Sequence, residues 1–273
     1  MNICLFKPDE IDKPLNIRDE RAQHIIKILH KKEGDSFAAG IIGGKAGTAT
    51  ITSLDIHQVT NEKGKQFDEG QMQFLFTAQS DGKLLFPLTM IIGFPRPIQL
   101  KRLLRDMAGL GVEAVHLTGT ELGEKSYLES DLATTDSGYQ MLLEGTEQAA
   151  STHIPLLCRH DTLEECVDSV MNKTSITPAV ANTTPLFITL DNIDTTENLS
   201  GFLNNHPALD EKSHLPRRVI AAIGSERGWT AKERTLLEQK GFVRLSMGHR
   251  VLRTETAATV AASIILSAMG VLD

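Results

Sequence analysis

The sequence predicts an α/β protein with a mainly parallel sheet, preceded by a small β domain. From Leu88 onward, short apolar runs typical of buried strands alternate with segments of helical periodicity, which is typical of a parallel sheet with crossover helices. The earlier part instead shows strand-like runs separated by glycine turns. The 273 residues suffice for one large or two modest domains. We place the boundary at the tight turn Asp81–Gly82, which gives domains over residues 1–80 and 81–273.

The first domain is expected to be mostly β. Strands are expected over Ser36–Ile42 and Ala46–Ile56, joined by a hairpin turn whose glycines lack the spacing of a phosphate-binding loop. His24–Leu29 has helical character. The polar stretch Thr60–Gly70 is expected to be a loop.

The second domain opens with a strand, a helix and a second strand. Leu88–Phe94 is a buried-strand run, and the leucines that follow it repeat at helical spacing. Gly109 and Gly111 are expected to end that helix before the strand Val112–Thr118. The further elements expected are helices over Tyr139–Ala150, Thr162–Met171, Thr230–Gly241 and Thr254–Met269, a short helix within 194–216, and strands over Leu186–Leu190, Val219–Ile223 and Phe242–Leu245.

Composition sets limits on function. The net charge of -7 counts against a nucleic-acid partner, although it does not exclude local basic patches. No apolar run reaches the ~20 residues of a membrane span, and the first residues lack a signal peptide's apolar core. The three cysteines are scattered without metal-ligand spacing, so we expect reduced thiols, a cytoplasmic protein and no metal site. Basic residues gather in three places: Arg18, Arg21, Lys27, Lys31 and Lys32; Arg96, Lys101, Arg102 and Arg105; and Arg244, Arg250 and Arg253.

For the first two of these groups, a solvated charged face is the default interpretation. In the third group, Arg250 and Arg253 lie in one of three loops that follow strands, where open α/β sheets bind their ligands. Leu186–Leu190 runs into Asp191-Asn192, and Val219–Ile223 runs into G-S-E-R-G-W-T. Phe242–Leu245 runs into S-M-G-H-R-V-L-R-T-E-T-A.

These loops have both an ordinary and a functional interpretation. Gly224 and Gly228 are either turn glycines or places where the backbone approaches a ligand. The charges before the last helix either form ion pairs, Arg253 with Glu255 or Arg250 with Glu226, or face a substrate. The dinucleotide fingerprint G-x-G-x-x-G is absent, which disfavours a nucleotide enzyme of that kind.

At these residues the chain resembles the uridine-N3 methyltransferases of small-subunit ribosomal RNA, which belong to the knotted SPOUT class. G-S-E-R-G-W-T looks like that family's G-P-E-G-G-F-S, and R-V-L-R-T-E-T-A matches its R-I-L-R-T-E-T-A. The second motif is long and specific. The resemblance extends over the chain, because His24–Asp35 is similar to the family's N-terminal PUA-like β-barrel, an RNA-binding module.

The resemblance implies a trefoil knot near the carboxyl terminus, an exception to the rule that chains are un-knotted. It also implies the cofactor S-adenosylmethionine, a homodimer, and ribosomal RNA or the small subunit as partner. Carried over residue by residue, the cofactor contacts fall at Leu190, Gly224, Ser225, Gly228, Leu245, Ser246, Gly248, Arg250, Val251 and Leu252.

The implied reaction transfers a methyl group to ring nitrogen 3 of uracil. That nitrogen lies on the Watson–Crick edge and carries a proton, so the base must be unpaired or flipped out and then deprotonated. Arg253 is the candidate to stabilise charge on the uracil oxygens. Glu226 or Glu255 is the candidate to accept the proton or to orient the arginine.

Several positions depart from the family's pattern. Ser225, Arg227 and Trp229 replace its Pro, Gly and Phe, while Arg96 and Gln99 stand where Lys and Arg are usual. Asp106, Gly109 and Ser151 replace a Lys, a Glu and an Arg. These changes leave open a different RNA site, or an RNA-binding protein that has lost catalysis on the same fold. The intact R-T-E-T-A favours the enzyme.

Overall fold

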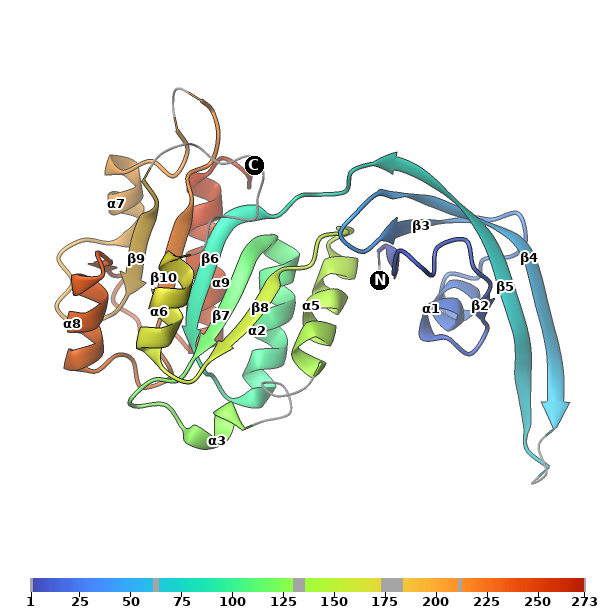
Figure 1. Cartoon of the computed structure of the whole chain (residues 1–273), viewed down its shortest axis with the longest axis horizontal. Coiled ribbons are helices and arrows are strands. Elements are labelled where there is room, and N and C mark those ends of the chain that lie inside the picture. Colours follow the sequence, from blue (N-terminus) through green and yellow to red (C-terminus); the bar gives the residue numbers. More distant parts are fainter. Residues whose placement is uncertain (1, 61–63, 130–135, 173–183, 211–212, 273) are drawn as a thin grey trace. The chain divides into compact units, whose positions relative to one another are not determined.

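The computed structural model describes residues 2–60, 64–129, 136–172, 184–210 and 213–272 (Figure 1). The chain divides into two compact units. The first comprises Met1–Leu84 and Glu147–His153, and the second comprises Leu85–Thr146 and Ile154–Asp273. The boundary expected after residue 80 lies four residues later, after Leu84. The sequence did not indicate that the chain returns to the first unit over Glu147–His153.

The first unit is built on a five-stranded sheet in the order β1-β3-β4-β5-β2. β1 pairs with β3 in parallel, and the other pairs are antiparallel. Buried side chains such as Phe6, Ile25, Met72 and Phe74 form its core. The elements are β1 (Cys4–Phe6), β2 (Leu15–Asn16), α1 (Glu20–Gln23), the π-helical turn η1 (His24–Ile28), β3 (Ser36–Ile41), β4 (Ala46–Thr60) and β5 (Gln66–Ser80).

The prediction of a loop over Thr60–Gly70 is wrong. β4 and β5 are 15-residue strands that stay paired as far as Thr60 and Gln66. The residues from Ile56 to Thr60 are almost all exposed, so the end of this hairpin lacks the apolar alternation by which a half-buried strand is recognised.

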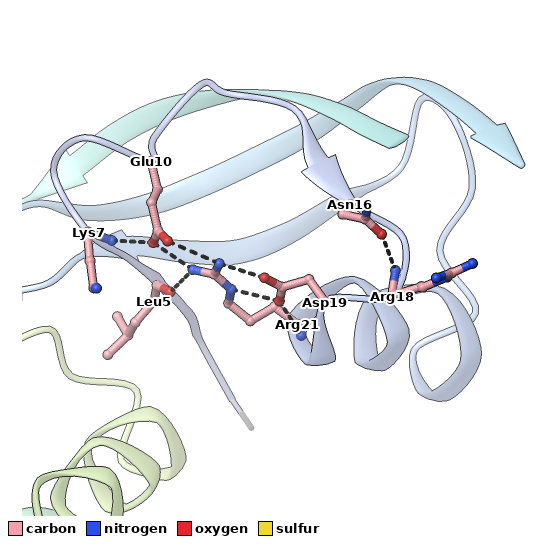
Figure 2. A network of polar contacts seen from close by, with 7 residues as sticks. All are labelled: Leu5, Lys7, Glu10, Asn16, Arg18, Asp19 and Arg21. Atoms are coloured by element: carbon pink, nitrogen blue, oxygen red, sulfur yellow. Dashed lines mark hydrogen bonds and ion pairs between the residues drawn. The ribbon is translucent and has the colours of Figure 1, made fainter. Parts of the chain in front are cut away.

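Arg21 is the centre of a polar network in the first unit (Figure 2). Its guanidinium contacts Asp19 at 2.8 Å and Glu10 at 2.9 Å, donates to the carbonyl of Leu5, and lies over the ring of Phe6. The hydrogen bonds from Arg21 lower the pKa of both carboxyl groups. The prediction that the basic residues near the N-terminus form a solvated face is therefore wrong for Arg21, whose side chain is only 19% exposed.

The segment 147–153 is hydrogen-bonded into the first unit. The carbonyl of Glu147 accepts the amides of Asn2 and Ile3 at 3.1 and 3.3 Å. The Thr152 hydroxyl donates to the carbonyl of Gly44, and the Ser151 hydroxyl donates to the carbonyl of Lys83. Ser151 stands where the family usually has an arginine. It is buried, and its hydroxyl forms a hydrogen bond within the first unit.

The second unit contains a six-stranded sheet in the order β11-β9-β10-β6-β7-β8, and every pair is parallel. This confirms the α/β class with a parallel sheet. Its elements are β6 (Phe86–Gly93), α2 (Pro97–Leu110), β7 (Val112–Thr118), α3 (Lys125–Leu128), α5 (Ser137–Gln148), β8 (Leu156–His160), α6 (Leu163–Met171), β9 (Leu186–Leu190), α7 (Leu199–Asn205), β10 (Val219–Ile223), α8 (Ala231–Gln239), β11 (Val243–Leu245) and α9 (Thr254–Ala268).

Helices cover both faces of this sheet (Figure 1). The Ala-rich α9 packs between α2 and α7 over β6 and β10, while α6 and α8 pack on the opposite face. α8 begins with the expected capping box of Thr230 and Glu233. Gly109 does not end α2, which continues to Leu110; the left-handed C-cap is Gly111, with φ 75°. No helix in the described ranges is long and apolar enough to cross a membrane.

The chain order places a crossover point at the centre of the sheet. From β6 the chain moves outward through β7 to β8, whereas β9, β10 and β11 lie on the other side. β6 and β10 are therefore neighbours, and the loops that follow them lead to helices on opposite faces of the sheet, α2 and α8. Ligands of open α/β sheets bind at such a position, beyond the carboxyl ends of the strands.

Candidate functional site

A cavity of about 330 Å³ lies at the carboxyl ends of β9 and β10. Three segments form most of its wall, namely 190–193 after β9, 223–228 after β10 and 247–257 after β11. Arg234 of α8 completes the lining. The three strand-to-helix loops selected from the sequence therefore meet at one site.

The loop after β10 is folded tightly on itself. The Gly228 amide donates to the carbonyl of Ser225 at 2.8 Å, and Gly228 has φ +73°, a conformation that favours glycine. A Cβ on Gly224 would lie 2.9 Å from the carbonyl carbon of Gly228. Both glycines are thus required by the turn itself, and they also leave backbone exposed to the cavity.

The loop after β11 is held by the segment that follows β9. The Ser246 amide donates to the carbonyl of Glu197 at 3.0 Å, and the Leu199 amide donates to the carbonyl of Ser246 at 2.8 Å. The chain then turns at Gly248, with φ +102°, and returns past the cavity to α9. The main-chain groups of Ser246 are therefore committed to protein contacts.

Eight of the ten residues assigned to the cofactor line this cavity: Leu190, Gly224, Ser225, Gly228, Gly248, Arg250, Val251 and Leu252. Leu245 and Ser246 do not. Leu245 is fully buried in the core, and Ser246 lines a neighbouring hollow with 195–201.

Of the three residues assigned to catalysis, only Glu226 lines the cavity. Arg253 is the exposed N-cap residue of α9, and Glu255 is 7% exposed in its first turn. Both adjoin lining residues, because Leu252 and Thr254 belong to the cavity wall.

The ion pairs considered as an alternative for these charges are not formed. Among the described residues, neither Arg250 nor Arg253 lies within 4 Å of a carboxylate. Glu226 instead contacts Arg96, with 3.3 Å between Oε1 and Nε. The pKa of Arg96 is raised, first by its hydrogen bond with Tyr127 and then by the charge of Glu226.

Asp191 and Arg234 are site residues that the sequence motifs did not reveal. The Asp191 carboxylate is 2% exposed; it accepts from Arg234 Nε at 2.6 Å and from the amides of Asn192 and Ile193 at 2.8 and 3.2 Å. Both residues line the cavity. The position of Asp191 directly after a strand was the available signal, but its partner lies 43 residues away on α8.

Polar contacts also join the loop after β10 to the loop after β7. The Thr120 hydroxyl donates to the Ser225 hydroxyl at 3.0 Å, and Arg227 pairs with Glu124 at 3.1 Å. The Glu233 carboxylate accepts the Glu121 amide at 2.9 Å. Arg227, one of the departures from the family's motif, therefore has a partner within this chain.

The fold and the cavity place the chain among α/β proteins whose ligand site lies at the carboxyl edge of a parallel sheet. Residues 83–266 match the family model of the RNA methyltransferase domain. Because this match spans more than half of the chain, the protein belongs to that family.

Curated relatives resemble the chain over nearly its full length. It is 38% identical over 271 residues to ribosomal RNA small subunit methyltransferase E of Treponema pallidum, covering 98% of this chain and 91% of the relative. It is 30% identical over 265 residues to methyltransferase E 1 of Borreliella burgdorferi, covering 97% of each.

Solved structures of other proteins share the fold. The Neisseria gonorrhoeae methyltransferase E bound to S-adenosyl methionine superposes with a TM-score of 0.65 at 17% identity, over 98% of this chain and 97% of that one. A probable rRNA methyltransferase from Porphyromonas gingivalis gives 0.67 at 18% identity, over 98% of both chains.

Proposed function

We propose that the chain uses S-adenosylmethionine to methylate ring nitrogen 3 of a uridine in small-subunit ribosomal RNA. The observation that carries the proposal is the cavity between the loops after β9, β10 and β11, lined by most of the residues that the resemblance assigns to the methyl donor. The relatives named as small-subunit methyltransferases support the RNA substrate.

The cavity suits a ligand of this kind. Its 330 Å³ falls within the range of about 300–1,000 Å³ for small-molecule sites. Leu190, Val251 and Leu252 offer apolar surface, Gly224 and Gly228 present backbone, and the Asp191–Arg234 pair adds charge. When bound, S-adenosylmethionine supplies an electrophilic methyl group, and the chain's own groups must bring the uracil to it.

The residues around the cavity have distinct parts in this proposal. Arg253 is exposed and unpaired among the described residues, so it is available to stabilise negative charge on the uracil oxygens. Glu226 lines the cavity with a side chain 37% exposed, and it is the better placed carboxylate to accept the N3 proton. Glu255 is almost fully buried and does not lie within 4 Å of Arg253, so it is the less well placed of the two carboxylates for either role.

The remaining expectations form part of the same proposal. A trefoil knot agrees with the hydrogen bonds of Ser246, since the chain after β11 runs alongside 197–199. We propose that the first unit is a PUA-like module that binds RNA, and that the protein acts in the cytoplasm as a homodimer.

Two experiments test the proposal. Calorimetry of the full chain with S-adenosylmethionine should show one binding event per chain, and absence of binding would overturn the enzyme in favour of an RNA-binding protein on the same fold. Modification mapping of ribosomal RNA from cells lacking the protein should show the loss of one 3-methyluridine. If a different modification disappears, the enzyme stands and the N3 assignment fails.

A further inference from the structure

Two histidines and a cysteine converge on the face of the sheet that α6 covers, away from the cavity. His116 lies on β7, His160 ends β8 and Cys166 lies on α6. One donor atom from each, a ring nitrogen or the thiol sulfur, lies within 4.8 Å of the other two. His116 and Cys166 are 2% and 0% exposed, and His160 is partly exposed.

The two imidazoles approach each other through their ring nitrogens. Nδ1 of His116 lies 2.9 Å from Nε2 of His160, the ring planes differ by 6° and the centroids are 5.2 Å apart. With two neutral rings, one nitrogen donates its proton to the lone pair of the other. Two ring nitrogens that share one proton in a buried place can instead both bind one metal ion, which then lies to one side of the line that joins them, because the angle between ligands at a tetrahedral ion is about 109°.

The donor set favours a borderline or soft transition metal over the hard cations. Two imidazoles and one thiolate suit Zn²⁺, whereas Mg²⁺ and Ca²⁺ prefer oxygen ligands. On a tetrahedral zinc ion, Zn–N and Zn–S bonds of about 2.1 and 2.3 Å place neighbouring ligand atoms about 3.3–3.6 Å apart. The histidine nitrogens therefore need to separate by about half an ångström, and the sulfur lies within reach.

We propose that His116, His160 and Cys166 form a zinc site that fastens α6 to β7 and β8. Three protein ligands leave a fourth position for solvent, on the side where His160 is partly exposed. Binding requires the thiolate and two neutral imidazoles, so the thiol proton is released to solvent, while the proton between the rings moves to the outer nitrogen of the ring that donated it. The spacing of the cysteines gave no sign of this site, because its ligands come from three separate elements.

The test uses the full chain without a histidine tag, freed of metal by a chelator and then titrated with Zn²⁺ and with Co²⁺. We expect one ion per chain by elemental analysis after gel filtration, a thiolate-to-cobalt charge-transfer band, and a higher melting temperature with zinc. Failure of the untagged chain to retain stoichiometric metal, or a cobalt spectrum without the thiolate band, overturns the proposal.

Variants identify the ligands. His160→Gln and Cys166→Ser should each lose the bound ion and the gain in melting temperature, while their melting temperatures in chelator stay close to that of the wild type. Cys166→Ala replaces Cys166→Ser if the serine variant does not fold. The matched control is Cys158→Ser, a neighbouring thiol on β8 that lies outside the three-ligand group. Retention of zinc by Cys166→Ser together with its loss from Cys158→Ser would overturn the assignment.

Discussion

The guanidinium of Arg234 on α8 lies 2.6 Å from the carboxylate of Asp191, the first residue after β9. The side chains are 15% and 2% exposed, so the ion pair is deeply buried. Both residues line the cavity proposed to hold S-adenosylmethionine. The pair therefore joins α8 to the cavity wall and supports the turn at 191–193.

Replacing Arg234 by methionine should both destabilise the protein and weaken cofactor binding. Asp191 would keep its two backbone donors but lose its cation, and breaking a buried pair costs about 3–5 kcal/mol, of which we expect the lower end. Chemical unfolding and calorimetry with S-adenosylmethionine measure the two effects. Lys240→Met is the control, because its pair with Asp168 is 33% and 49% exposed and should contribute less than about 1 kcal/mol. Equal losses in the two variants would contradict a special role for the buried pair.

The parallel sheet was predictable because each of its central strands is a short apolar run followed by a turn signal, as in Leu186–Leu190 and Val219–Ile223. The loops that line the cavity were predictable for the same reason, since they follow those strands. The partners of the site charges were not. Arg96 lies 130 residues from Glu226 in the chain, and only the adjacency of β6 and β10 brings them together. The full length of the β4–β5 hairpin was not predictable because its far end is exposed and polar.

Gly93→Ala should damage the site although Gly93 does not line the cavity. A Cβ there would overlap the amide nitrogen of Ser225 and lie 2.9 Å from the carbonyl carbon of Gly224, so the loop after β10 would have to move. We expect a loss of about 1–3 kcal/mol in the free energy of unfolding, together with weaker binding of S-adenosylmethionine.

Gly109→Ala is the matched control for this substitution. Gly109 lies inside α2, and a Cβ added there would have no neighbour within 4 Å, so alanine should stabilise the helix by about 0.5–1 kcal/mol. Denaturant unfolding of both variants should therefore give shifts of opposite sign. A Gly93→Ala variant that unfolds and binds like the wild type would show that the loop after β10 can shift without cost.

Arg253→Ala should abolish methyl transfer while leaving the affinity for S-adenosylmethionine nearly intact. Arg253 is exposed, caps α9 through its backbone only and is absent from the cavity lining. Removing a group that stabilises transition-state charge costs about 10²–10³ in kcat. Arg250→Ala is the contrasting variant: Arg250 lines the cavity, so it should weaken cofactor binding. Loss of cofactor binding in Arg253→Ala would instead assign Arg253 a structural role.

The Arg21 network should make the first unit sensitive to acid. Hydrogen bonds from Arg21 lower the pKa of Glu10 and Asp19 from ordinary values of 4.5 and 3.8 (Figure 2). Because the pKa is lower in the folded chain, this stabilisation is fully present above the ordinary values and is lost as the pH falls through the folded ones.

Arg21→Gln should therefore destabilise the first unit at pH 7, by about 1–3 kcal/mol, and its difference from the wild type should shrink between pH 5 and pH 3. Amide hydrogen exchange in β3, β4 and β5 reports on this unit, because Trp229, Tyr127 and Tyr139 all belong to the second one. Fluorescence of Trp229 is the internal control and should change little. Arg18→Gln is the matched variant, since its pair with Glu69 is about half exposed and should contribute little at any pH. A wild-type advantage that stays constant from pH 7 to pH 3 would mean that Arg21 acts through its packing on Phe6 and its bond to Leu5, and not through the two carboxylates.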